Sequence, residues 1–277
     1  MARRLANDGG VRTMPAPKTA EPQPAEKSER FKDGLAQHAF PHQYANAARW
    51  LEKNIYPQKT ELNMLEVGIG RNGAGPWLLA HSLRNNGKKG GVVGIDIDSE
   101  CIKTTLEAPR LDLFDLIWST GMSDGNSKWI GEFVRKNGGK TLEKLGGRLD
   151  EDAWRDAFGT DAAVMQPDTK ALEGMVRLER ASIFEYEPKE KFDAAVCVTL
   201  MMHFDQPERV KLLSSMAKAL KPGGTLIVDG LPGGQKFADL AELEAKFDAS
   251  KYGLEAVAVV TPQEGEHSHT LYVFKKR

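Results

Sequence analysis

The chain has 277 residues, with 38 lysines and arginines against 39 aspartates and glutamates, which gives a formal net charge of -1. This balance provides no basic footprint for nucleic acid or for an anionic membrane surface, so neither is expected as a partner. Hydrophobic residues make up 40% of the chain, a globular composition, and no apolar run reaches the roughly 18 residues that span a bilayer.

Residues 1–30 contain four prolines among alanine, glutamate and lysine residues. Such a segment cannot build a packed core and lacks the apolar stretch of a secretory signal, so we expect a flexible tail. At about 150 residues per domain, residues 31–277 are expected to form one domain with an insertion. The two cysteines, Cys101 and Cys197, support neither a disulfide framework nor a zinc cluster, which favours a reducing, cytoplasmic location.

The folded part opens with a helical pattern. Apolar residues recur at three- and four-residue steps from Tyr44 to Ile55 and predict an amphipathic helix over 43–55. A strand is expected at 62–67, followed by a glycine-rich turn and a helix with Pro76 in its first turn. Further apolar runs predict strands at 92–97, 176–180, 194–198, 225–228, 254–260 and 270–274.

A further helix is predicted between the fourth and fifth strands. Asp205 is its expected N-cap, and Glu208 completes a capping box three residues later. The apolar face is predicted to consist of Val210, Leu213, Ala217 and Leu220. The sequence Lys-Pro-Gly-Gly at 221–224 is expected to stop this helix and turn the chain into the next strand.

Strands that alternate with helices indicate a parallel sheet with helices on both faces. The last two strands are too close in sequence for a crossover helix, so we expect an antiparallel hairpin. The segment 107–175 exceeds what one crossover needs, and we interpret it as a helical insertion. It holds Trp118, Trp129 and Trp154, which could form a lid over the site or the insertion's own small core.

The glycine pattern Gly68-x-Gly70-x-x-Gly73 lies between a predicted strand and a predicted helix, and Asp96 follows Gly73 by 23 residues at the end of the next strand. Glycines let backbone approach a ligand closely, and the following helix offers free N–H groups. A carboxylate at the tip of the second strand can bind both hydroxyls of a ribose. The pattern therefore indicates a ligand that contains a nucleoside.

Glu66, two residues before the first glycine, selects among nucleoside ligands. Its carboxylate would repel the diphosphate of a nicotinamide cofactor but suits a cationic ligand. S-adenosylmethionine carries both an ammonium and a sulfonium.

At this point the chain resembles the class I S-adenosylmethionine-dependent methyltransferases. Five segments carry the resemblance, in the family's order: Leu-Glu-Val-Gly-Ile-Gly at 65–70, Val-Gly-Ile-Asp-Ile at 93–97, Phe-Asp-Ala-Ala-Val at 192–196, Met-Met-His-Phe at 201–204 and Leu-Lys-Pro-Gly-Gly-Thr-Leu at 220–226. The resemblance implies an α/β fold with a seven-stranded, doubly wound Rossmann-like sheet. Its strand order would be 3-2-1-4-5-7-6, with the last strand antiparallel and the insertion after strand 2.

The resemblance also implies roles for single residues in binding S-adenosylmethionine. Glu66 with the Gly68 and Gly70 backbone would hold the methionine portion, while Asp96 would bind the ribose and Ile97 would lie against the adenine. Ser182 stands where the family usually has an aspartate for the adenine amino group. The remaining residues assigned to the cofactor are Ile183 and Cys197.

Two residues in the glycine loop depart from the family pattern. Asn72 replaces the family's third glycine, and Arg71 beside it is atypical. Arg71 would either meet the cofactor carboxylate or remain solvated.

Methyl transfer needs alignment of the acceptor and exclusion of water more than acid–base groups. His203 is the candidate base for an acceptor that must lose a proton, and a capping or packing role is the alternative. The residues predicted to contact the substrate are Tyr44, Trp118 and Met202. The remaining histidines lack a third ligand, so no metal site is predicted.

We therefore expect a methyltransferase that acts on an O or N atom of a small molecule. Two alternatives remain open at this point. One is an enzyme that cleaves or cyclises with S-adenosylmethionine instead of donating its methyl group, and the other is an NAD-dependent dehydrogenase, which uses the same glycine spacing.

Overall fold

The computed structural model describes residues 41–70, 73, 75–107, 111–112, 164–165, 169–261 and 270–277. The predicted tail at 1–30 and most of the predicted insertion lie outside these residues. The flexibility of the tail and the lid role of the insertion therefore stay predictions.

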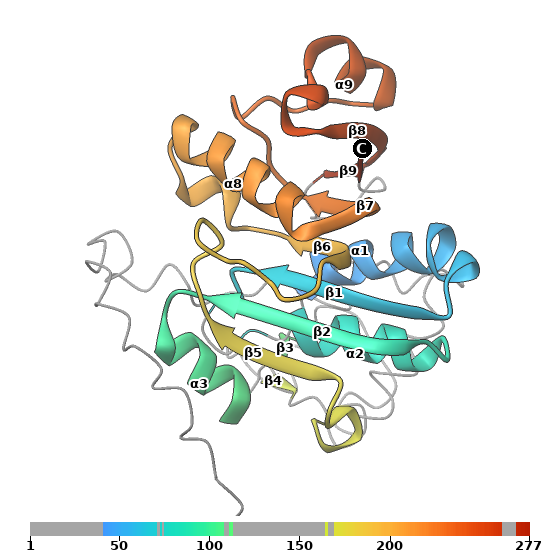
Figure 1. The fold of residues 1–277 in the computed structure, drawn as a ribbon, viewed down its shortest axis with the longest axis vertical. Coiled ribbons are helices and arrows are strands. Elements are labelled where there is room, and N and C mark those ends of the chain that lie inside the picture. The colour runs from blue at the N-terminus through green and yellow to red at the C-terminus, as the bar shows by residue number, and fades with distance from the viewer. Residues whose placement is uncertain are drawn as a thin grey trace, which may run out of the picture. The chain divides into compact units, whose positions relative to one another are not determined.

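Seven strands form one mixed sheet in the order β5-β2-β1-β6-β7-β9-β8 (Figure 1). Counted along the chain, this is the predicted order 3-2-1-4-5-7-6, which is confirmed. The last strand runs antiparallel to both of its neighbours, as predicted. The strand bounds are β1 (Glu61–Val67), β2 (Lys89–Asp96), β5 (Val176–Arg180), β6 (Phe192–Cys197), β7 (Leu220–Val228), β8 (Leu254–Val260) and β9 (Leu271–Lys276).

Helices cover both faces of the sheet. The side chains of each central strand point alternately to the two faces, and both sets are buried under helices. α1 (Pro41–Asn54) and α2 (Gly75–Asn85) share one core cluster with Leu62 and Met64. α8 (Gln206–Ala219) and α9 (Leu240–Lys246) share the other with Leu65 and Val67. α3 (Ser99–Glu107) follows β2, and short 3-10 turns occur at η3 (Tyr56–Gln58), η4 (Lys170–Leu172), η5 (Met201–His203) and η6 (Ala249–Tyr252).

The helix after β6 has the predicted capping box, since the Asp205 side chain accepts from the Glu208 N–H and the Glu208 side chain accepts from the Asp205 N–H. Its predicted apolar face is partly wrong. Val210 is 38% exposed, whereas Leu212 and Met216 are buried beside Leu213 and Ala217. The buried face of α8 therefore includes more residues than the sequence pattern predicts, and it is rotated about the helix axis away from Val210.

The predicted stop at 221–224 is only partly as expected. The helix ends at Ala219, and Leu220 already pairs with Phe192 in the sheet. The next pair is Thr225 with Ala194, so the four Lys-Pro-Gly-Gly residues lie within the bounds of β7 as an unpaired irregularity opposite the single residue Asp193. The strand therefore begins five residues earlier than the predicted 225–228.

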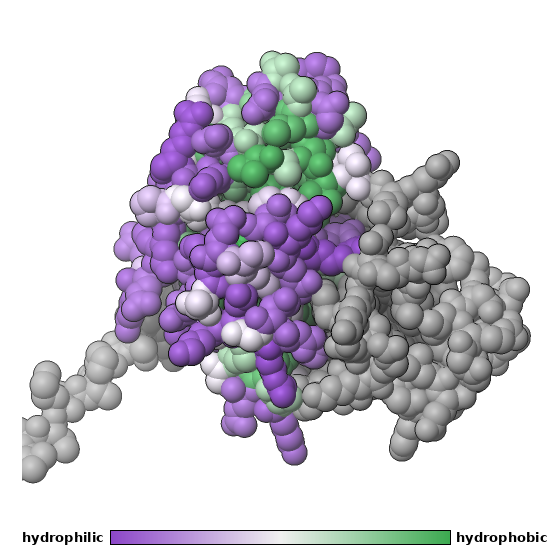
Figure 2. Space-filling view, turned by 90° about the vertical axis from the view of Figure 1, so that its right-hand side faces the viewer, coloured by the Kyte–Doolittle hydropathy of each residue, from purple (hydrophilic) through white to green (hydrophobic). Residues whose placement is uncertain are grey.

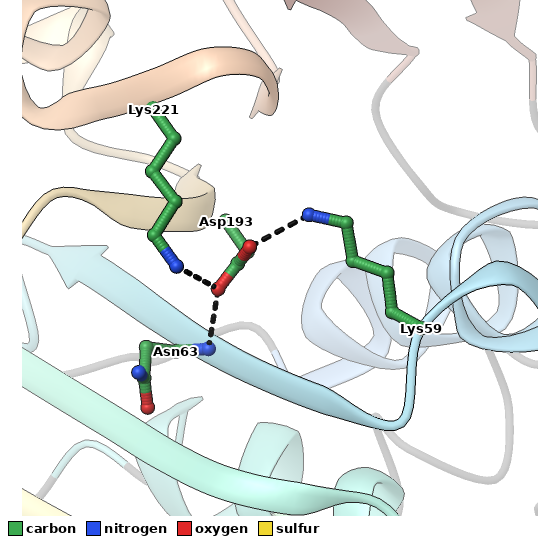
Figure 3. A network of polar contacts seen from close by, with 4 residues as sticks. All are labelled: Lys59, Asn63, Asp193 and Lys221. Carbon is green, nitrogen blue, oxygen red and sulfur yellow. Dashed lines mark hydrogen bonds and ion pairs between the residues drawn. The ribbon is translucent and has the colours of Figure 1, made fainter.

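An ion-pair cluster ties together the starts of three strands (Figure 3). Asp193 on β6 accepts from the Asn63 backbone N–H on β1 at 3.0 Å, from Lys59 Nζ at 2.6 Å and from Lys221 Nζ of β7 at 2.8 Å. Burial alone would raise the pKa of Asp193, but the Asn63 N–H and the two ammonium groups outweigh it and lower this pKa. Parallel strands start at this edge of the sheet, so the cluster lies opposite the carboxyl ends.

The ends of the insertion meet in a second, small sheet. β3 (Leu111–Asp112) and β4 (Val164–Met165) pair antiparallel, which brings together two points more than fifty residues apart. Residues 113–163 between them, including Trp118, Trp129 and Trp154, lie outside the described residues.

The β8–β9 hairpin closes one edge of the sheet. Figure 2 shows hydrophobic residues gathered at the level of this hairpin. Val257 on β8 is 38% exposed, and Val259 and Val260 are half-buried. Among the helices in the described ranges, none is long and apolar enough to cross a membrane.

Candidate active site

Glu66 is a fully buried acid near the end of the central strand β1. Strand alternation places it on the same face as Leu62 and Met64, beneath α1 and α2. Tyr44 of α1 donates from its hydroxyl to Glu66 Oε1 at 2.5 Å. The second oxygen, Oε2, is buried and has no hydrogen-bond partner in the structure. The site therefore presents one carboxyl oxygen that is held and one that is available.

Burial raises the pKa of Glu66 to about 8; the Tyr44 hydrogen bond lowers this pKa and the negative charge of Asp96 raises it. An ionised carboxylate without a cation is costly in such a place. A positively charged ligand group at Oε2 would remove that cost.

The glycine-rich loop follows β1 directly. Gly68 and Gly70 adopt φ angles of 83° and 71°, in the region that favours glycine. The Gly68 N–H donates to the Ile95 carbonyl of β2 at 2.9 Å. A Cβ at Gly73 would lie 1.9 Å from the Ile69 carbonyl oxygen, so the loop closes too tightly for any side chain there. Arg71 and Asn72 lie outside the described residues.

Asp96 connects this loop to the end of β2. Its Oδ2 accepts from the Gly70 N–H at 3.1 Å, and its Oδ1 accepts from the Asp98 N–H at 2.9 Å. Burial raises the pKa of Asp96, against the effect of these N–H groups. Ile97 comes next and is 49% exposed at the same edge of the sheet. The structure thus brings Glu66, Gly68, Gly70, Asp96 and Ile97 to neighbouring strand ends.

The remaining predicted cofactor residues lie near two further strand ends: Ser182 and Ile183 follow β5, and Cys197 is the last residue of β6. Ser182 is half-buried and its Oγ accepts from the Phe184 N–H at 3.3 Å. Ile183 is buried in the core cluster that α8 covers. Cys197 is fully buried in the same cluster, and burial raises the pKa of its thiol. Their roles in cofactor binding stay predictions.

The segment after β6 carries the predicted catalytic and substrate residues. Met202 is 53% exposed, and His203 beside it is half-buried. The His203 N–H donates to the Leu200 carbonyl, which closes η5. Leu200 packs against the glycine loop, since a Cβ at Gly68 would lie 2.8 Å from its Cδ2. Met202 and His203 therefore lie two and three residues after Leu200, which covers the loop.

Two site features were missed by the sequence analysis. Thr199 has a φ of 65°, rare for a residue with a side chain, and its N–H donates to Asp229 Oδ2 at 2.6 Å. Asp229 comes directly after β7, so its place at a strand end was the available signal.

Tyr44 was predicted to touch substrate. It is buried against Glu66, and its contact with an acceptor stays a prediction.

The parallel strands β2, β1, β6 and β7 end at one edge of the sheet, and Glu66, Gly68, Asp96 and Cys197 lie at or next to those ends. Residues 157–224 match the family model of a methyltransferase domain. This match covers about a quarter of the chain. It includes β5, β6 and α8, whereas the glycine loop lies outside it.

Three solved structures show what this chain is similar to. Magnesium protoporphyrin IX methyltransferase from Synechocystis PCC 6803 with bound SAM is 13% identical, over 86% of this chain and 80% of that one, with a TM-score of 0.46. The N-methyltransferase NodS from Bradyrhizobium japonicum WM9 is 13% identical, over 91% and 93%, with a TM-score of 0.42. The cyclase SpnF is 13% identical, over 84% and 81%, with a TM-score of 0.44.

All three scores lie below 0.5, so the fold assignment rests on the strand order of this chain. No curated protein matches the sequence. Within the described residues, no group of three or more histidine, cysteine, aspartate or glutamate side chains is arranged to hold a metal ion.

Proposed function

We propose that this chain transfers a methyl group from S-adenosylmethionine to an oxygen or nitrogen atom of a small molecule. The observation that carries the proposal is the buried Glu66, whose Oε2 has no partner, beside a glycine loop and a second strand-end acid. Buried polar atoms in folded proteins are almost always hydrogen-bonded. An unpartnered carboxyl oxygen at a strand end therefore points to a cationic ligand group.

The residues present fit S-adenosylmethionine in charge and in hydrogen-bonding capacity. Glu66 Oε2 would accept from its ammonium, and the Gly68–Gly70 backbone would lie along its methionine portion. Asp96, already held by two backbone N–H groups, would accept from the ribose hydroxyls. Ile97 would lie against the adenine, with Ser182 near its edge.

S-adenosylmethionine supplies, when bound, a methyl group on a positively charged sulfur. The remaining task of the chain is to align an acceptor with that methyl group and to exclude water. His203, half-buried after η5, would accept the proton that an O–H or N–H acceptor loses as its new bond to carbon forms. Met202 would contact the acceptor from the same segment, with Tyr44 and Trp118 as further predicted contacts.

The small-molecule assignment is supported by the near-zero net charge. Both cysteines are free and buried, which is in keeping with a reducing, cytoplasmic location. A nicotinamide cofactor is disfavoured, because its diphosphate would face the carboxylate of Glu66.

The test is incubation with S-adenosylmethionine carrying a deuterated methyl group, alone and with a panel of phenols and amines, followed by mass spectrometry. Methyl transfer predicts equal amounts of S-adenosylhomocysteine and of an acceptor that has gained the label. His203→Ala should lower turnover of a phenol while leaving S-adenosylhomocysteine affinity unchanged. Methylthioadenosine formed without an acceptor would instead indicate cleavage of the cofactor, and protection of the protein from thermal unfolding by NADH alone would indicate a dehydrogenase.

A further inference from the structure

Gln43, in the first turn of α1, is a buried amide whose polar atoms are both unpartnered. Its side chain is fully buried, and neither Oε1 nor Nε2 has a hydrogen-bond partner. Among the described residues, the only other buried side-chain atom in this condition is Glu66 Oε2. Leaving an amide unpaired in a protein interior costs on the order of 1–3 kcal/mol. Such a cost is expected where a ligand supplies the missing partners.

The first turn of α1 lies beside the glycine loop and β1. Tyr44, the next residue after Gln43, donates to Glu66 and so fixes this turn to the end of β1. Its ring also packs against Gly75, where a Cβ would lie 2.5 Å from Tyr44 Cζ. Gly75 is the first residue of α2, directly after the glycine loop. Gln43 is therefore held at the loop end of the sheet by the contacts of its neighbour.

The charged side chains described at this end of the sheet leave the carboxylate of an amino-acid ligand without a binding partner. Glu66 and Asp96 suit an ammonium and a ribose, but both would repel the carboxylate of an amino acid. Lys59 and Lys221 cannot serve it, because both pair with Asp193 at the opposite edge. Arg71, which the sequence offers for this carboxylate, lies outside the described residues. Among the described residues, the Gln43 amide is a buried donor without an acceptor.

We propose that Gln43 binds the carboxylate of the amino-acid end of S-adenosylmethionine through Nε2, while Glu66 Oε2 receives the ammonium. This inference rests on the proposed function and adds a specificity residue to it. Gln43 and Glu66 together then recognise a zwitterion, whereas Asp96 recognises the nucleoside. The two halves of the ligand are read by different residues and can be tested separately.

The experiment compares two ligands by calorimetry: S-adenosylhomocysteine, and methylthioadenosine, which has the same nucleoside and sulfur but no amino-acid end. Gln43→Leu is expected to weaken S-adenosylhomocysteine binding about tenfold, the value of one hydrogen bond to a charged group. Its methylthioadenosine affinity should stay within twofold of wild type. Its melting temperature should equal or exceed that of wild type, because an unpaired buried amide has been removed.

Gln58→Leu is the matched control, since Gln58 is an exposed glutamine whose Nε2 donates to the Asn54 carbonyl at the other end of α1. It should change neither affinity. Gln43→Glu is a second variant, which places a carboxylate against the ligand's own and should weaken only S-adenosylhomocysteine binding, by more than the leucine variant does.

The outcomes separate the inference from the function on which it rests. Unchanged S-adenosylhomocysteine affinity in both Gln43 variants, or an equal loss for both ligands, would overturn the role of Gln43 while leaving a cofactor site in place. Wild-type protein that binds neither ligand would overturn the proposed function, and the inference with it.

Discussion

The Tyr44 hydroxyl lies 2.5 Å from Glu66 Oε1 and occupies that oxygen, so Oε2 of the same carboxyl group is the one left without a partner. The contact joins α1 to the end of β1 across 22 residues of sequence. Because Tyr44 donates, it also stabilises the charged form of Glu66 against the cost of burial. Tyr44 is therefore a positioning residue for the acid that the account assigns to the ammonium.

Tyr44→Phe should weaken S-adenosylhomocysteine binding about threefold to tenfold, the value of one lost hydrogen bond to a charged group. Binding needs ionised Glu66, so wild-type affinity should rise as pH increases through about 8, the raised pKa of that acid. Loss of the Tyr44 hydrogen bond raises this pKa further, so the midpoint should move to higher pH. Calorimetry between pH 6 and 9 measures both effects.

Tyr56→Phe is the matched control, because Tyr56 is also a buried tyrosine but its hydroxyl contacts Ser82. Its pH midpoint should equal that of wild type. Three other groups raise the pKa of Tyr44 or Glu66 through their negative charge: Asp96, Cys197 and Asp229. A midpoint that is the same in Tyr44→Phe as in wild type would exclude the positioning role.

The stability of the ligand-free protein should depend on pH through Glu66. Its pKa is raised from 4.5 to about 8 on folding, so the folded state holds a proton that the unfolded state releases. This contribution is fully present below pH 4.5 and is lost as pH rises toward 8, with a slope of up to about 1.4 kcal/mol per pH unit. Glu66→Gln removes the titration.

Urea unfolding of both proteins at several pH values isolates this term as the difference between them. The variant should gain stability relative to wild type as pH rises from 5 to 8. A difference that stays constant over this range would show that Glu66 titrates normally.

Gly73→Ala should disrupt the loop. Its Cβ would lie 1.9 Å from the Ile69 carbonyl oxygen, and backbone atoms must move to relieve such a contact. We expect at least a tenfold loss of S-adenosylhomocysteine affinity. Gly174→Ala is the control: this glycine has a φ of 81° but no atom within 4 Å of an added Cβ, so it should cost about 1 kcal/mol of stability without changing affinity. Equal affinities for the two variants would argue against the loop as the binding element.

Asp193→Asn should separate stability from binding. The substitution removes the charge that holds Lys59 and Lys221 but retains an acceptor for the Asn63 N–H. We expect a loss of about 2 kcal/mol in the free energy of unfolding, with S-adenosylhomocysteine affinity unchanged, because the cluster lies at the opposite edge. Asp248→Asn, at an exposed ion pair with Lys251, should cost much less. A large loss of affinity in Asp193→Asn would contradict the assignment of the ligand site and the Asp193 ion-pair cluster to opposite edges of the sheet.

The strand order was predictable because its signals are local. The runs at 176–180 and 254–260 match β5 and β8 in full, and the capping box from Asp205 to Glu208 marks the start of α8. Glu66 and Asp96 could be placed at neighbouring strand ends for the same reason. The buried face of α8 and the early start of β7 differ from the pattern, and the start of β7 depends on the pairing of Leu220 with Phe192 in β6.

The features that could not be predicted depend on contacts between distant segments. Asp193 accepts hydrogen bonds from Asn63 and Lys59, which lie more than a hundred residues earlier in the chain, and no local sequence pattern indicates these contacts. Thr199 meets Asp229 only because β6 and β7 end side by side. Gln43 occupies a buried position on α1 where periodicity calls for an apolar residue, and its burial appears only once α1 is packed on the sheet.

The most direct test of the account is calorimetric titration of S-adenosylhomocysteine into wild-type protein and into Glu66→Gln and Asp96→Asn, with the exposed Glu61→Gln as control. We predict binding by wild type and by the control, and at least a tenfold loss of affinity in each of the two site variants. Undiminished affinity in both site variants, or no binding by wild type, would contradict it.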